Sequence, residues 1–127
     1  MDAAVSSSHA VISISNTNFE AEVLHAPKPV LLLCGFKKQM VSDQVGVLRQ
    51  VSASIYNGNI HFCMLEEDFI HAFKQMYQIA GLPIFLLFDK GREIGRMLGM
   101  ADQAHLRAFL DRCLPESDER PGEETAW

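Results

Sequence analysis

The sequence lacks any pair of cysteines spaced as Cys-x-x-Cys. Its three cysteines are Cys34, Cys63 and Cys113, so any disulfide scheme within the chain leaves one of them over. A two-cysteine reduction cycle needs two neighbouring thiols, and this spacing does not supply them. The odd count indicates reduced thiols and predicts a cytoplasmic location.

Long apolar runs and an excess of positive charge are also missing. No apolar stretch approaches the length of a membrane span, and the opening residues MDAAVSSSH lack the basic and apolar regions of a signal peptide. The net charge of −5 argues against nucleic-acid binding, which needs a basic face. We therefore expect neither a nucleic-acid nor a membrane partner.

Metal-ligand spacing is absent as well. No two histidines share a ligand spacing with each other or with a cysteine, so we expect no metal site and no other cofactor. The histidines are His9, His25, His61, His71 and His105.

What is present is enough apolar material for one domain. The chain has 127 residues, of which 48% are hydrophobic, with eight phenylalanines. Residues 1–9 are small and polar and are expected to be disordered, and residues 10–114 form the domain. Residues 115–127 hold five acidic side chains against Arg120 alone, which predicts a flexible acidic tail.

Apolar spacing predicts alternating strands and helices. Asn16 or Thr17 is the expected cap of the first helix, and Gly46 interrupts the second. Strands separated by helices are expected to run parallel, and the last two strands form an antiparallel hairpin. The expected strands are 11–14, 30–34, 60–65, 84–88 and 93–98, and the expected helices begin near Phe19 or span 39–56, 67–79 and 102–114.

This order, β-α-β-α-β-α-β-β-α, and the run YQIAGLPIFLLF from Tyr77 to Phe88 resemble the thioredoxin-like family over residues 10–114. The resemblance implies an α/β fold, with a mixed five-stranded sheet covered by helices on both faces. It also implies a cis peptide bond before Pro83, which in thioredoxins faces a Cys-x-x-Cys pair at the start of a helix. Gly99 would let the backbone of a partner approach this turn closely.

The chain departs from the family where the family carries its chemistry. The residues matching the Cys-x-x-Cys pair are Lys38 to Val41, which read KQMV. Thioredoxins also bury an acid and a lysine that assist proton transfer, and the matching positions here are Leu32 and Met64. The chain therefore resembles a non-catalytic member of the family, with no catalytic residues, and we expect that it is not an enzyme.

The resemblance implies that the surface around Pro83 holds a partner protein or an extended peptide. Such a protein would act as an adaptor, a chaperone or an assembly factor. In the competing interpretation, Leu82 and Leu98 point into the core and the methionines only fill gaps. The expected partner-binding residues are Phe36, Lys37, Lys38, Gln39, Met40, Leu82, Pro83, Leu98, Gly99 and Met100.

Two other functions stay open. Cys34 would serve a monothiol redox protein if Lys37 and Lys38 activate it, although a free cysteine at the end of a central strand is also a common buried residue. The second open function is that of a structural subunit, which forms a homodimer through a sheet edge or through the groove around Pro83. Trp127, at the end of the acidic tail, could dock into a partner or fold back onto the groove.

Overall fold

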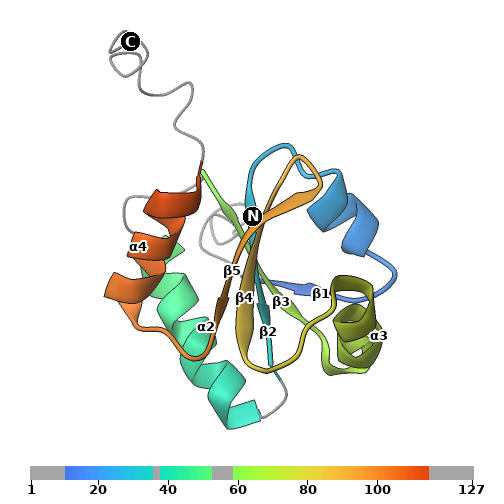
Figure 1. Ribbon diagram of the computed structural model, residues 1–127, viewed down its shortest axis with the longest axis horizontal. Coiled ribbons are helices and arrows are strands. Elements are labelled where there is room, and N and C mark those ends of the chain that lie inside the picture. The colour runs from blue at the N-terminus through green and yellow to red at the C-terminus, as the bar shows by residue number, and fades with distance from the viewer. Residues whose placement is uncertain (1–10, 36–37, 53–58, 115–127) are drawn as a thin grey trace, which may run out of the picture.

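A computed structural model of the chain describes residues 11–35, 38–52 and 59–114, and describes only the backbone for residues 38–42. Figure 1 shows a central sheet between two layers of helices. The strands are β1 (Ile12–Ile14), β2 (Val30–Cys34), β3 (His61–Leu65), β4 (Ile84–Asp89) and β5 (Arg92–Leu98). The helices are the π-helix η1 (Glu20–Leu24), α2 (Lys38–Ser52), α3 (Glu67–Tyr77) and α4 (Gln103–Cys113).

The sheet has five strands in the order β1-β3-β2-β4-β5, which confirms the expected mixed α/β architecture. β3 pairs in parallel with both β1 and β2, whereas β4 pairs antiparallel with β2 and with β5. Figure 1 places α2 and α4 on one face of the sheet and η1 and α3 on the other.

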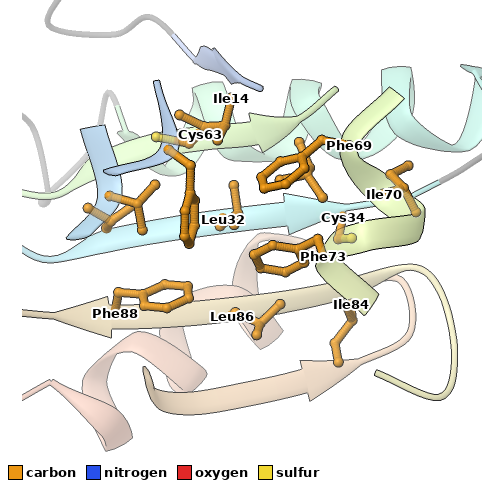
Figure 2. Close-up of a cluster of buried hydrophobic side chains, with 14 of the residues drawn as sticks. Ile14, Leu32, Cys34, Cys63, Phe69, Ile70, Phe73, Ile84, Leu86 and Phe88 are labelled. Carbon is orange, nitrogen blue, oxygen red and sulfur yellow. The ribbon is translucent and has the colours of Figure 1, made fainter. Parts of the chain in front are cut away.

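The expectation that all strands separated by helices run parallel is wrong for β4. Cys34 at the end of β2 lies opposite Ile84 at the start of β4, so the two strands run in opposite directions. Figure 2 shows α3 lying across the strands near Cys34 and Ile84. Because α3 does not carry the chain back to the far end of the sheet, β4 starts where β2 finishes.

Each face of the sheet has its own apolar cluster. Beneath η1 and α3, aromatic rings meet edge to face, with the Phe19 and Phe73 centroids 5.6 Å apart and those of Tyr77 and Phe88 5.5 Å apart. Figure 2 shows part of this cluster. Beneath α2 and α4, side chains such as Leu48 and Phe109 cover the other face. The two clusters together exclude water from both sides of the central strands.

The start of the first helix differs from the sequence prediction. Neither Asn16 nor Thr17 caps η1; its cap position is Phe19, which offers no side-chain acceptor. The Asn18 amide instead accepts from the Ser15 N–H at 2.7 Å and so stabilises the preceding turn.

The other helix ends lie close to the predicted positions. Gly46 lies within α2 without ending it, and the predicted continuation into 53–56 falls outside the described residues. α3 ends at Tyr77, two residues early, because Gln78 takes a left-handed conformation with φ +53°. The N-cap of α4 is Asp102, whose carboxylate accepts from the His105 N–H.

Gly91 fits a turn that other residues would strain. Lys90 and Gly91 in the β4–β5 hairpin both have positive φ, as a type I′ turn requires. A Cβ on Gly91 would lie 2.8 Å from the backbone oxygen of Leu24. The hairpin therefore packs against η1 with no room for a side chain at this position.

We expect opposite effects from alanine at two of the glycines. Gly91→Ala should lower the free energy of unfolding by about 2 kcal/mol, because φ of +80° is strained for alanine and the Leu24 carbonyl must shift. Gly46→Ala, with no atom within 4 Å of its Cβ, should raise it by about 0.5 to 1 kcal/mol. Urea denaturation measures both, and equal effects of the same sign would contradict this packing.

Candidate functional site

The turn before β4 brings together several residues that the sequence places apart. The peptide bond between Leu82 and Pro83 is cis. The Gly99 N–H donates to the Pro83 carbonyl at 2.8 Å, and Ile84 lies opposite Leu98 in the β4–β5 ladder. Leu82, Pro83, Leu98 and Gly99 therefore lie next to one another, and Met100 follows directly.

This surface, which we call the Pro83 surface, consists of Leu82, Pro83, Leu98, Gly99 and Met100. Leu98 is 65% exposed and Met100 is 55% exposed, whereas Pro83 is buried. Leu82 is half-buried and packs against the cluster beneath α3. The competing interpretation thus holds in part for Leu82, while the side chain of Leu98 is open to solvent.

Glycines shape this surface. Gly99 has φ +104°, which favours glycine, and, its two chain neighbours apart, no atom of the described residues lies within 4 Å of the position that a Cβ would take. A Cβ on Gly81 would lie 3.2 Å from Cδ1 of Leu98, so the Leu98 side chain lies over the turn. Among the described residues, none outside the adjoining chain therefore fills the space beside the Gly99 backbone.

The remaining predicted partner-binding residues lie near the start of α2. Phe36 and Lys37 lie outside the described residues. Lys38, Gln39 and Met40 lie in the first turn of α2, and the structure describes their backbone alone. Their role in partner binding stays a prediction.

Arg96 holds the segment that leads into the turn. Its guanidinium donates to the Tyr77 carbonyl at 2.9 Å and to Glu93 at 2.6 and 2.8 Å. The hydrogen bond to Glu93 raises the pKa of Arg96 above its usual value. The end of α3 is thus tied to β5, two residues before Leu98.

Gln44 is a further residue of this region that is not among those predicted from the sequence. Its side chain is only 3% exposed, and both ends of its amide bond the backbone of Ala101. A sequence signal existed, because this polar residue stands between Val41 and Leu48 on the otherwise apolar face of the helix.

The Cys34 side chain is buried in the core and does not reach solvent. It lies at the end of β2 with 0% exposure, and Figure 2 shows it among Ile70, Phe73 and Ile84. Burial raises the pKa of this thiol to about 12, although the charge of Lys74 partly opposes the shift. This environment disfavours the thiolate, which is the nucleophilic form.

The other candidate ligand groups are scattered. Within residues 11–35, 38–52 and 59–114, no three His, Cys, Asp or Glu side chains lie together as a metal site. His61 pairs instead with Glu22 at 3.0 Å, and His105 pairs with Asp102 at 2.8 Å. None of the helices in these ranges is long and apolar enough to cross a membrane.

Comparison with known proteins gives a consistent picture. The thioredoxin family profile matches residues 10–112. A thioredoxin of Pseudomonas aeruginosa is 29% identical over 80% of this chain and 94% of its own length. A thioredoxin of Acidithiobacillus ferridurans is 30% identical over 84% of this chain and 99% of its own length. Thioredoxin C-2 of Corynebacterium nephridii is 26% identical over 80% of this chain and 94% of its own length.

These comparisons contradict the prediction that the protein is not an enzyme. All three relatives carry the name thioredoxin, and thioredoxins are oxidoreductase enzymes. That prediction rested on the missing Cys-x-x-Cys pair. The family match, in contrast, extends over residues 10–112.

The strand register also corrects the positions matched to the family's buried acid and lysine. Leu32 lies opposite Cys63, and its side chain belongs to the cluster beneath α3, whereas Met64 packs beneath α2. Met64 lies opposite Leu33, which shares its face of the sheet. The pair that can meet is therefore Leu33 and Met64, and both side chains are apolar.

We expect Cys34 to be a slow thiol in the folded protein. At pH 8, a pKa near 12 in place of 9.0 reduces the thiolate fraction about a thousand-fold. Iodoacetamide should therefore label Cys34 at least about a thousand-fold more slowly in the native chain than in concentrated urea. Mass spectrometry of the labelled peptides measures this ratio. Half-buried Cys113 serves as the internal comparison, and labelling of Cys34 ahead of Cys113 would contradict the expectation.

Proposed function

This chain belongs to the thioredoxin family, and on that premise we propose that it binds an extended segment of a partner protein at the Pro83 surface. Such binding suits an adaptor, a chaperone or an assembly factor. The observation that carries the proposal is the exposure of two large apolar side chains, Leu98 and Met100, on either side of Gly99. Exposed apolar side chains that cluster in this way are typical of interaction sites.

The geometry suits an extended chain. Leu98 and Met100 offer apolar contacts, and the space at Gly99, which no described residue beyond its chain neighbours fills, leaves room for a partner's backbone. Methionine adapts its shape to different side chains, which suits the binding of varied segments. This binding requires no thiol from Cys34, which lies beneath the surface with 0% exposure.

A homodimer is the second candidate, and the edge strand β5, which pairs on one side only within the described residues, favours it. β5 pairs with β4 on one side and ends the strand order on the other. Ile94 on this strand is 37% exposed. An unpaired edge strand is a template for pairing with another chain. Sedimentation velocity at several protein concentrations distinguishes a dimer from a monomer that binds peptides.

We also propose a cytoplasmic setting. Cys34, Cys63 and Cys113 are all free in the structure, and burial raises the pKa of both Cys34 and Cys63. Reduced cysteines of this kind are usual where glutathione and thioredoxin systems keep thiols reduced.

Peptide binding should depend on Leu98 and Met100. The probe is the tightest peptide that a random phage-displayed library yields against the wild-type protein, labelled for fluorescence anisotropy. Leu98→Asp and Met100→Asp should each raise its Kd at least about tenfold, because each places a charge in the apolar contact. Both side chains are largely exposed, so urea denaturation should show little loss of stability.

Ile94→Asp is the matched control, since Ile94 is an exposed apolar residue on the same strand. We expect its Kd to stay within about twofold of the wild-type value, as for surface changes away from an interface. Wild-type affinity in both Leu98→Asp and Met100→Asp would refute binding at this surface. Loss of affinity in Ile94→Asp alone would place the contact at the sheet edge.

A further inference from the structure

Gln44 carries a pair of hydrogen bonds that joins two distant segments. Its Nε2 donates to the Ala101 carbonyl at 3.1 Å, and its Oε1 accepts from the Ala101 N–H at 2.7 Å. The side chain therefore bonds both polar backbone groups of a single residue. In the described part of the chain, Gln44 and Ser52 are the only polar side chains classed as buried.

These bonds anchor the segment that carries Met100. On one side of Met100, the Gly99 N–H is bonded to the Pro83 carbonyl at 2.8 Å. On the other side, Ala101 is 7% exposed and held by Gln44. Met100 thus lies between two fixed points while its own side chain is 55% exposed.

The segment needs such an anchor for a physical reason. The left-handed backbone at Gly99 ends the β5 strand, so Ala101 lies beyond the last ladder pair, in which Leu98 lies opposite Ile84. The Ala101 N–H and carbonyl are buried, and a buried backbone group without a partner is costly. Gln44, in the second turn of α2, supplies the partner that the sheet does not.

We propose that Gln44 is a positioning residue for the Pro83 surface. Through Ala101 it holds Gly99 and Met100 in the conformation that receives the partner segment, so that the surface is formed before the partner arrives. It also couples this surface to α2, because the bonds originate on that helix. This role rests on the proposed partner binding. A surface ordered in advance avoids the entropic cost of ordering it on binding.

The test compares Gln44→Met with Val51→Ala. Methionine keeps the length and unbranched shape of glutamine but makes neither hydrogen bond to Ala101. Val51 is buried on the same face of α2, seven residues and about two turns further on, so its truncation weakens packing but leaves both hydrogen bonds from Gln44 to Ala101 in place. Urea denaturation establishes that both variants fold and how much stability each has lost.

Hydrogen exchange of the Ala101 amide and the Met100 methyl resonance report on positioning in the free protein, and peptide affinity reports on it in the complex. In Gln44→Met, hydrogen exchange of the Ala101 amide should accelerate at least about tenfold beyond the change in Val51→Ala, and the Met100 methyl resonance should shift. The selected peptide should bind Gln44→Met at least about tenfold more weakly, and Val51→Ala within about twofold of wild type. Should Gln44→Met not fold, Gln44→Leu also removes both hydrogen bonds to Ala101 and should show the same changes.

The outcomes separate the two proposals. Protection of Ala101 and an unmoved Met100 methyl in Gln44→Met would overturn the positioning role, as would equal peptide affinities in Gln44→Met and Val51→Ala. If wild-type protein selects no peptide, the proposed binding fails, while the exchange of Ala101 and the Met100 resonance still decide whether Gln44 orders the segment.

Discussion

The burial of β2 on both faces is the constraint on which the rest of the structure depends. Its five residues, Val30–Cys34, are between 0 and 1% exposed. Alternate side chains enter the cluster beneath α3 and the cluster beneath α2, so each helix layer is held by the same strand. Every other strand of the sheet is arranged outward from it, β3 and β1 on one side and β4 and β5 on the other.

The burial of β2 also determines which side chains reach solvent at the end of the sheet where Cys34 lies. Cys34 belongs to the buried strand, so its thiol has a raised pKa and no access to solvent. The pairing of Cys34 with Ile84 starts β4 at the same end of the sheet, which places Pro83 directly before it. The apolar residues that reach solvent at this end, Leu98 and Met100, come from β5 and the segment after it. At this end of the sheet the Cys34 thiol is therefore buried, while the side chains of Leu98 and Met100 are exposed.

The chain combines membership of the thioredoxin family with an unusual spacing of its cysteines. The family match covers residues 10–112, and the relatives bear the name of an oxidoreductase. Yet the only cysteines in the chain are Cys34, Cys63 and Cys113, and no two of them have the spacing of a dithiol motif. The turn with its cis peptide bond at Pro83 is nevertheless present, and its carbonyl is engaged by Gly99. The partner binding that we propose at this turn rests on both the family membership and this geometry.

The sequence by itself determined the helices and strands, since apolar runs and helical spacing indicate which side chains of each segment are buried. The continuous run 30–34, the Gly81-x-Pro83 turn and the hairpin at Gly91 were all legible, because each depends on neighbours in the chain. Only the tertiary structure decided the antiparallel direction of β4, since that depends on the path of α3 across the sheet.

The tertiary structure also decided which residues the individual side chains contact. Strand register, which periodicity does not reveal, placed Met64 beside Leu33 rather than Leu32 and left Leu98 in solvent. In the sequence, Gln44 is a single polar residue on an apolar helix face. Its hydrogen-bond partner, Ala101, lies 57 residues away in the chain. The local pattern of the sequence indicates which face of a helix or strand is apolar, but only the packing of distant segments decides which side chains are buried and what they contact.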